Sequence, residues 1–415
     1  MAGRILIFFL LVTLIELYFL QAVRTFSQDF SASKRTAILY TAYGIALLNF
    51  VMGLISVFYP PNQWHFILRY ISAALLILVV CKLFGISFLI IDDLVRFFRW
   101  LVSLFTHSGD STTEALKPGI SRLKFLSQAA MAVTVLPAIG FIYGMVRGAY
   151  KYRVHSVKVP SSRLPASFDG FRIVQLSDIH TGSFVNTNAL KKAFGIVKSL
   201  NADMIVFTGD LVNNEAKETE GFEEIFAQLQ APYGVYSVLG NHDYGDYVHW
   251  DSEQAKKANL ARLKAVQETA GWRLLMNEHV AIERNGEKIA LMGVENWGGS
   301  MHFPKYGRLA DAHGGSQHYP FKILLSHDPS HWDKQVRKEF RDIDLTLSGH
   351  THGMQMGIEI PGFKWSPVKY FYKFWAGLYR DGEQFLYVNR GLGFLGYPGR
   401  LGIWPEITLL ELKRV

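Results

Sequence analysis

The chain has 415 residues, which is long enough for more than one domain. Hydrophobic residues make up 49% of it and the mean hydropathy is positive, which excludes an ordinary soluble protein. The formal net charge of +8 is typical of a protein beside an anionic membrane surface or of one that handles anionic substrates. The basic residues form no clustered stripe, so we expect no nucleic acid binding.

The apolar residues concentrate in four segments of the first 150 residues, at 5–23, 37–59, 70–91 and 125–146. Each has about 20 residues, the length that crosses the hydrocarbon core of a bilayer. We therefore expect a four-helix transmembrane region over residues 1–150 and a multi-pass integral protein of the cell membrane, with the lipid bilayer as its partner. Lys and Arg are nearly balanced between the two sets of flanking loops, so the sequence does not decide which side of the membrane the remainder faces.

Two of these segments contain a charged residue near the middle of the membrane, Glu16 in the first and Lys82 in the third. Such groups are costly in hydrocarbon unless they are paired, so we hypothesise that they form an ion pair. The only cysteine, Cys81, also lies in the third segment, which excludes a disulfide within the chain. Residues 92–105 are either an interfacial amphipathic helix or a continuation of the third span.

The second half of the chain has a different pattern. After a basic linker at residues 151–169, short apolar runs of β type alternate with longer helical stretches, which is typical of an α/β domain over residues 170–415. The helical stretches cover 188–200 and 252–269. The predicted strands are 172–177, 203–208, 234–239, 322–326, 344–348 and 384–389.

Metal-ligand chemistry follows directly on five of these strands. Ligands of open α/β sheets bind at the carboxyl ends of strands, so these side chains are expected to meet. Carboxylates, imidazoles and an amide without cysteine suit Mn, Fe, Zn or Co. There are too many for one ion, which indicates two divalent metal ions that clamp a phosphoryl displacement. The seven candidate ligands are Asp178, His180, Asp210, Asn241, His327, His350 and His352.

The order of these blocks (DIH, GD, GNHD, H and GHTH) resembles the calcineurin-like metallophosphoesterase superfamily over about residues 170–415. The N-terminal membrane region further resembles its membrane-anchored bacterial branch of YkuE- and YaeI-like proteins. The resemblance implies a four-layer α/β/β/α sandwich and two ions that share Asp210. It assigns one ion to Asp178, His180, Asp210 and His352, and the other to Asp210, Asn241, His327 and His350.

The resemblance also implies a catalytic role for His242, which follows Asn241 in the GNHD block. A metal-bridging hydroxide would attack the phosphorus in line, while His242 contacts the phosphoryl oxygens and protonates the leaving group. In the phosphoprotein phosphatase branch the GD block continues as GDxVDRG, and its second Asp orients that histidine. Asn213 stands at this position, which argues against that branch and leaves the partner of His242 open.

Two further features have both a functional and a structural interpretation. Arg390 follows the last strand and either neutralises an anionic substrate or belongs to an ordinary turn. The aromatic and lysine-rich stretch 363–379 either lies at a membrane interface beside the site or closes the domain against a sheet. We expect five histidines outside these blocks to be surface or loop residues: His249, His302, His313, His318 and His331.

These observations favour a membrane-anchored, metal-dependent phosphoesterase that hydrolyses a phosphodiester or pyrophosphate bond. Some relatives cleave the pyrophosphate of UDP-diacylglucosamine, so the substrate class includes a membrane lipid or nucleotide-linked lipid. One alternative is a non-catalytic scaffold on the same fold, although every ligand position is filled. The other is a membrane sensor or transporter with a phosphoesterase appendage, which only Glu16 and Lys82 favour.

Overall fold

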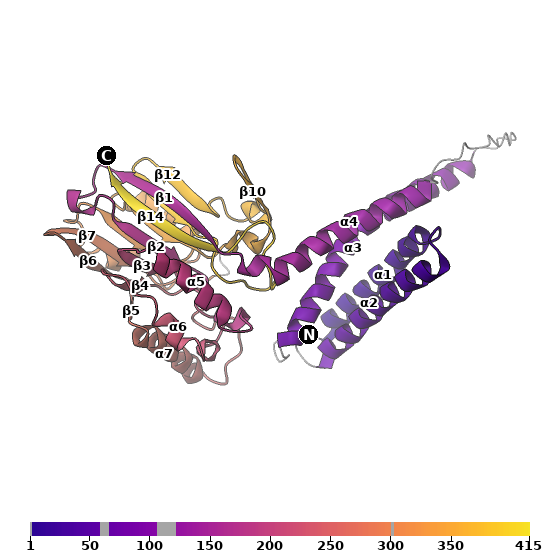
Figure 1. Cartoon of the computed structure of the whole chain (residues 1–415), viewed down its shortest axis with the longest axis horizontal. Coiled ribbons are helices and arrows are strands. Elements are labelled where there is room, and N and C mark those ends of the chain that lie inside the picture. The colour runs from indigo at the N-terminus through magenta and orange to yellow at the C-terminus, as the bar shows by residue number, and fades with distance from the viewer. Residues whose placement is uncertain (1, 59–65, 106–121, 300–302) are drawn as a thin grey trace. The chain divides into compact units, whose positions relative to one another are not determined.

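The computed structural model describes residues 2–58, 66–105, 122–299 and 303–415 (Figure 1). The chain divides into two compact units, Met1–Tyr143 and Gly144–Val415. Each unit has its own architecture and is described separately.

The first unit consists of long apolar helices. Within the described residues, four helices are long and apolar enough to cross a membrane. They are α1 (Ala2–Phe26), α2 (Ala32–Phe58), α3 (Phe66–Ser103) and α4 (Arg122–Val146). α3 runs without interruption through residues 92–103, so this stretch continues the third helix and is not a separate interfacial helix.

Two buried charged side chains of the first unit are paired with each other. Glu16 of α1 and Lys82 of α3 form an ion pair in which Lys82 Nζ lies 2.6 Å from Glu16 Oε2. Asn49 of α2 donates a hydrogen bond of 2.9 Å to the other carboxylate oxygen of Glu16. All three side chains are buried, so one polar cluster joins three helices and the hypothesis of a Glu16–Lys82 pair is confirmed.

The second unit contains two six-stranded sheets. In spatial order the first sheet is β1 (Arg153–Ser161), β14 (Glu406–Arg414), β2 (Arg172–Leu176), β3 (Met204–Phe207), β4 (Val235–Ser237) and β5 (Trp272–Leu274). The second is β12 (Gly377–Asp381), β13 (Gln384–Val388), β9 (Leu345–Ser348), β8 (Lys322–Leu325), β7 (Glu287–Gly293) and β6 (Glu278–Arg284). A separate hairpin joins β10 (Ile358–Ile360) to β11 (Phe363–Trp365).

The two sheets pack face to face and helices cover their outer faces. The core between the sheets includes Ile173 and Val206 from the first sheet and Leu291, Ile323 and Leu345 from the second. The first sheet is covered by α5 (Asn188–Ser199), α6 (Glu223–Phe226) and α7 (Glu253–Thr269) (Figure 1). The second is covered by α8 (Leu309–His313) and by η6 (Trp332–Val336), which is followed by α9 (Arg337–Glu339). This is the four-layer α/β/β/α sandwich that we expected.

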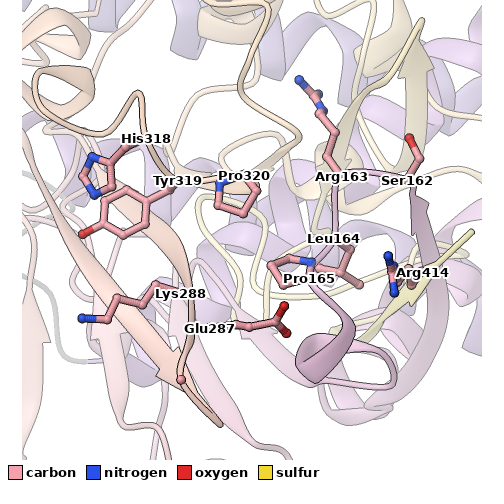
Figure 2. Close-up of a pocket in the computed structure, with 11 residues that line it drawn as sticks. Ser162, Arg163, Leu164, Pro165, Glu287, Lys288, His318, Tyr319, Pro320 and Arg414 are labelled. Carbon is pink, nitrogen blue, oxygen red and sulfur yellow. The ribbon is translucent and has the colours of Figure 1, made fainter.

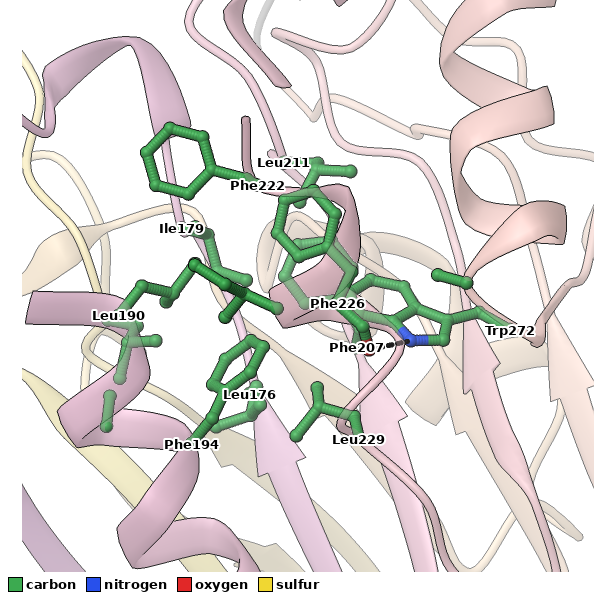
Figure 3. Packing of buried hydrophobic residues seen from close by; sticks show 14 of the residues in the cluster. Leu176, Ile179, Leu190, Phe194, Phe207, Leu211, Phe222, Phe226, Leu229 and Trp272 are labelled. Carbon is green, nitrogen blue, oxygen red and sulfur yellow. Dashed lines mark hydrogen bonds between the residues drawn. The ribbon is translucent and has the colours of Figure 1, made fainter. Parts of the chain in front are cut away.

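α5 shows how the sequence builds these layers. Its buried residues Leu190, Ala193, Phe194 and Val197 follow helical spacing and form one apolar face. Figure 3 shows Leu190 and Phe194 packed beside Leu176 of the adjacent sheet. Truncation of such a buried aromatic side chain to Ala costs about 3–5 kcal/mol of stability.

Residues 151–169 are not a linker. They contain β1, which pairs in parallel with β14 at the edge of the first sheet, and a short 3-10 turn at Ala166–Phe168. Along β1 Val159 is buried, whereas Arg153 and Lys158 are exposed. An edge strand carries charged side chains that discourage pairing with other chains, and this is why its sequence resembles a basic linker.

Candidate metal centre

All seven predicted ligands lie in loops at the carboxyl ends of strands. Asp178 and His180 follow β2, Asp210 follows β3, and Asn241 follows β4 in the first sheet. β2, β3 and β4 are parallel neighbours, so their carboxyl ends share one edge. The second sheet contributes the loops after its parallel strands β8 and β9, which carry His327, His350 and His352.

Backbone hydrogen bonds join these loops to one another. The amide of Asp178 donates to the carbonyl of Gly209 at 2.9 Å, and that of Gly349 donates to the carbonyl of His327 at 2.9 Å. Glycine is required where the loops meet, because a Cβ atom on Gly240 would lie 2.2 Å from Asp210 Oδ1. The backbone therefore brings together side chains that are far apart in the sequence.

The ligand-type side chains form two groups. Asp178, His180 and His352 make up the first, and Asp210, His327 and His350 the second; within each group one ligand atom per residue lies within 4.8 Å of the others. In the first group His352 Nε2 lies 3.2 Å from Asp178 Oδ1 and 3.1 Å from His180 Nε2.

Asp210 connects the two groups. Its Oδ2 atom lies 3.1 Å from His327 Nε2 in its own group and 3.6 Å from His180 Nε2 in the other. Its Oδ1 atom accepts a hydrogen bond of 2.8 Å from the backbone amide of His242. Asp210 is thus the residue whose carboxylate contacts a histidine of each group.

Hydrogen bonds on the far side of the histidine rings orient them. Nδ1 of His180 lies 3.1 Å from the carbonyl of Val212, and Nδ1 of His327 lies 2.7 Å from the carbonyl of Thr208. A carbonyl only accepts, so Nδ1 carries a proton and Nε2 is the ring atom that faces the centre of the site. This is the arrangement that fixes metal-binding histidines.

His350 uses the opposite nitrogen. Its Nε2 atom lies 2.7 Å from the hydroxyl of Tyr372, which donates in turn to Asp328 Oδ2 at 3.5 Å. Tyr372 therefore receives the Nε2 proton, and Nδ1 is left with its lone pair, buried and with no hydrogen-bond partner among the described residues. Because burial without a partner is costly, this free nitrogen fits a metal ligand.

Asn241 shows the same pattern. Its amide nitrogen donates a hydrogen bond of 2.9 Å to the hydroxyl of Tyr247. Its Oδ1 atom is buried and, within the described part of the chain, has no hydrogen-bond partner. An oriented amide oxygen of this kind is a ligand that divalent cations accept.

Several of these residues have a strained backbone. Non-glycine residues rarely adopt positive φ angles, which cost on the order of 1–3 kcal/mol each. Such strain clusters at functional sites, where the surrounding structure over-determines it. Five of the seven candidate ligands have positive φ: Asp178 (51°), His180 (50°), Asp210 (59°), His350 (71°) and His352 (49°).

The electrostatics of the site favour cation binding. Burial lowers the pKa of the His180 imidazole to about 3, so this side chain is neutral at physiological pH. Burial disfavours the ionised form of Asp210, but His327 and His242 outweigh it and hold the pKa of Asp210 well below its usual range. Burial also opposes protonation of His327, yet the Asp210 carboxylate raises the pKa of His327 to about 10. A cation at His327 Nε2 would displace this proton. The residues present therefore fit a pair of divalent metal ions.

His242 lies beside the two groups and is half-buried. Its Nδ1 atom lies 2.6 Å from the backbone carbonyl of Asn213. The partner that the sequence left open is thus a main-chain oxygen of the residue that stands in place of the phosphatase aspartate. The carboxylate of Glu218 holds that loop, because it accepts hydrogen bonds from the backbone amides of Asn213 at 2.6 Å and Asn214 at 3.0 Å.

Asp243, the next residue, organises the backbone of the site. Its buried carboxylate accepts hydrogen bonds from the backbone amides of Asp210 at 2.9 Å, Leu211 at 2.8 Å and Gly240 at 2.8 Å. It joins the loops after β3 and β4 and lies behind the ligands. Asp243 is therefore a turn residue.

Arg390 does not face a substrate. Only 3% of the residue is exposed, and its guanidinium is paired with Glu406 and Glu359, each at 2.5 Å. Its charge is balanced inside the fold, which corrects the expectation that it neutralises an anionic ligand. No sequence pattern pointed to Arg400, which is fully buried and donates to the backbone carbonyls of Arg390 at 2.7 Å and Gly393 at 2.9 Å.

One of the remaining histidines is placed differently from expectation. His331 is buried, with Nδ1 2.8 Å from Ser326 Oγ and the ring stacked on Trp297. Its position at the start of η6, which packs against the second sheet, buries it. His249 and His318 are exposed and His313 is half-buried, whereas His302 lies outside the described residues.

Two cavities differ in their relation to this centre. One of about 470 Å³ adjoins it, since Tyr372 lines the cavity and contacts His350, and Phe303 lies edge-on to the His350 ring at 4.9 Å. The other, of about 710 Å³, is lined by none of the predicted site residues (Figure 2). It lies at the amino ends of β7 and β8, whereas the ligand loops follow carboxyl ends of strands. Its lining includes Ser162, Arg163, Glu287, Lys288, His318 and Arg414.

Comparison with known proteins decides the family. The model of the calcineurin-like phosphoesterase family matches residues 171–354, and that of a probable calcineurin-like phosphoesterase transmembrane domain matches residues 3–149. The chain is 31% identical over 303 residues to the metallophosphoesterase YkuE of Bacillus subtilis, an alignment that covers 71% of this chain and 98% of YkuE. The chain belongs to the calcineurin-like phosphoesterase family.

Two other relatives come from two different organisms. The transmembrane protein with metallophosphoesterase domain of Danio rerio is 32% identical over 312 residues, which cover 73% of this chain and 66% of that protein. The phosphodiesterase YaeI of Escherichia coli is 26% identical over 298 residues, which cover 71% of this chain and 99% of YaeI. Together with the four apolar helices, these matches make the chain a membrane protein with a phosphoesterase unit.

Proposed function

We propose that the protein is a membrane-anchored, metal-dependent phosphoric ester hydrolase that cleaves a phosphodiester or pyrophosphate bond. One observation carries the proposal: six side chains with metal-ligand chemistry meet in two groups at the ends of four strands, and Asn241 follows a fifth strand, β4. Among them, two atoms that can bind a metal, Asn241 Oδ1 and His350 Nδ1, are buried without a hydrogen-bond partner among the described residues. A scaffold would gain nothing from such unsatisfied atoms.

The proposed ligand sets follow the two groups. Asp178, His180 and His352, with Asp210, hold one ion. The other is held by Asp210, Asn241, His327 and His350. Mn, Fe, Zn and Co all suit this donor set. When bound, two such cations supply an activated water molecule and neutralise charge on the phosphoryl oxygens.

His242 assists the leaving group in this proposal. Its Nδ1 proton is donated to the carbonyl of Asn213, so Nε2, on the opposite side of the ring, is the atom that serves the substrate. In the cationic form Nε2–H stabilises the departing oxygen and transfers its proton to it. The backbone amide of His242 also bonds Asp210, which fixes the ring beside the metal ligands.

The cavity next to His350 supports a substrate with an apolar group. Phe303, Phe371 and Phe374 contribute aromatic surface to it, while Lys334 and Lys373 contribute positive charge. A phosphoester that carries a hydrocarbon chain has an apolar part that suits the aromatic surface and a negative charge that suits the lysines. We therefore propose a membrane lipid or a nucleotide-linked lipid as the substrate class.

The test is turnover by the purified full-length chain in lipid nanodiscs. We expect manganese-dependent hydrolysis of bis(p-nitrophenyl) phosphate that exceeds hydrolysis of p-nitrophenyl phosphate and is abolished by EDTA. A panel of lipid phosphodiesters and nucleotide-linked lipid pyrophosphates then identifies the natural bond. Bound metal without turnover on any phosphoester would overturn the catalytic proposal in favour of a scaffold.

A further inference from the structure

The β10–β11 hairpin and the segment after it expose large apolar side chains. Soluble proteins rarely expose contiguous apolar surface without a binding partner. The exposed fractions are 51% for Ile358, 58% for Ile360, 52% for Phe363, 71% for Tyr370 and 75% for Phe371.

The hairpin has an outward and an inward face. Ile358 and Ile360 are two residues apart, and Phe363 is the cross-strand partner of Ile360, so these three side chains share one face. Glu359 and its cross-strand partner Lys364 point the opposite way. We call the face of Ile358, Ile360 and Phe363 the outward face.

The inward face fixes the orientation of the hairpin. Glu359 is paired at 2.5 Å with the buried Arg390, and Lys364 Nζ donates to the carbonyl of Ala376. Arg390 is itself held by Glu406 of β14. Glu359 and Lys364 alternate with the exposed residues, and these contacts hold them on the inward face. The outward face is therefore exposed as a consequence of the fold.

The base of this hairpin shares a loop with the chain that leaves the last apolar helix. Within residues 397–404, Arg400 N donates to the carbonyl of Gly144, in the last turn of α4, at 3.1 Å, and Leu401 N donates to the carbonyl of Gln355 at 2.8 Å. Gly357 N donates back to the carbonyl of Leu401 at 2.9 Å. Since α4 is apolar enough to cross a membrane, the residues that follow it emerge at the bilayer surface, and the loop holds the hairpin beside them.

The aromatic and basic residues around the outward face suit an anionic bilayer. Lys151, just after α4, lies over the Trp404 ring at 4.8 Å, a pairing typical of membrane interfaces. Lys369 and Lys373 are exposed, and no ion pair within the described residues involves either of them. The stretch 361–379 contains no Asp or Glu. Its positive charge therefore remains available to anionic headgroups, at about 1 kcal/mol per residue.

We propose that the outward face, with Tyr370, Phe371, Lys369 and Lys373, is a docking surface for the interfacial region of an anionic bilayer. Phe371 and Lys373 also line the cavity beside His350, so docking places the mouth of that cavity at the lipid surface. The proposal concerns binding and does not depend on catalytic turnover.

Depth-dependent fluorescence quenching in lipid nanodiscs tests this docking. In a Cys81→Ser background of the full-length chain, Ile360→Cys and Phe363→Cys are labelled with an environment-sensitive dye, and brominated lipids serve as the quencher. Glu283→Cys is the matched control, since its side chain is 56% exposed on β6, in the second sheet. We expect at least about twofold stronger quenching at the two hairpin positions than at the control.

The lipid composition separates the apolar and the charged contributions. Quenching at Phe363→Cys should rise when phosphatidylglycerol is added to phosphatidylcholine, and this rise should disappear in a Lys369→Gln/Lys373→Gln variant. Quenching equal to that at Glu283→Cys in both lipids would overturn the proposal. Cross-linking of two chains through Ile360→Cys, without quenching, would overturn it in favour of an interface between copies.

Discussion

Each unit of this phosphoesterase buries a cluster of polar and charged side chains, and the two clusters differ in how their atoms are satisfied. In the apolar helices, Glu16 receives hydrogen bonds from Lys82 and Asn49, so the carboxylate finds its partners within the protein. At the strand ends, Asn241 Oδ1 and His350 Nδ1 are buried without a hydrogen-bond partner among the described residues. Burial of charge is common to both, but only the second cluster leaves ligand atoms free.

The backbone adds a second difference. Five candidate ligands at the strand ends have positive φ angles, whereas Glu16, Asn49 and Lys82 lie within regular helices. Strain and unsatisfied polar atoms both cost stability, and a fold retains them where a ligand or a reaction requires them. The comparison therefore assigns chemistry to the strand-end cluster and stability to the helical one.

The largest effect is expected for the residue that joins the two metal groups. Asp210→Asn removes the shared negative charge, so phosphodiesterase activity should fall on the order of 1000-fold or more, since metal-ion stabilisation of the transition state amounts to several kcal/mol. Steady-state hydrolysis of bis(p-nitrophenyl) phosphate measures it. Asp311→Asn, on an exposed carboxylate paired with Arg308, is the control. Equal activity of Asp210→Asn and Asp311→Asn would contradict the assignment of chemistry to the strand-end cluster.

His242 sharpens the assignment of roles within the strand-end cluster. His242→Ala should lower kcat by about 100-fold or more for an ester with a poor leaving group, because general acid assistance is lost. The loss should be smaller for nitrophenyl esters, whose leaving group departs without a proton. Metal content should be unchanged, and exposed His249→Ala should behave like the parent protein. A loss that is independent of the leaving group would contradict the acid role.

Tyr372 has a smaller predicted effect. Tyr372→Phe removes the hydroxyl 2.7 Å from His350 Nε2 and frees that ring to rotate. Loss of such an outer hydrogen bond costs about 10-fold in metal affinity, so the manganese concentration for half-maximal activity should rise by this factor. Tyr370→Phe, at a 71% exposed position, is the control. An unchanged manganese requirement would show that Tyr372 does not orient His350.

The helical cluster should have no effect on turnover. Lys82→Met leaves Glu16 buried without its cation and should destabilise the helices by about 3 kcal/mol, measured as thermal unfolding in detergent. Glu16→Gln combined with Lys82→Met should cost less than the sum of the single changes, since the two side chains are in contact. Activity per folded molecule should stay at the level of the parent protein. Loss of turnover without loss of stability would support the sensor or transporter alternative.

Much of the site follows from the sequence because its ligands sit at fixed positions after strands. Short apolar runs predict β2, β3, β4, β8, β9 and β13, and the polar residues after five of these strands indicate the metal groups. Strand pairing then brings these residues together without further information. The same local logic predicts the four apolar helices, whose length and composition suffice.

The parts that the sequence did not predict depend on long-range contacts. The carbonyl of Asn213 orients His242, and a main-chain atom is invisible in a residue pattern. Arg390 resembles an anion-binding residue until its two carboxylate partners, 31 and 16 positions away, are located. β1 resembles a linker because its charged side chains face solvent at a sheet edge. In each case the identity of the residue is clear, and only its partner in the fold decides its role.

The central claim, that two cations share Asp210, is tested most directly by metal analysis and electron paramagnetic resonance on the manganese-loaded full-length protein. The account predicts about two Mn²⁺ ions per chain and a spectrum of exchange-coupled ions, as expected for ions about 3.5–4 Å apart. One ion per chain, or two ions without exchange coupling, would contradict it.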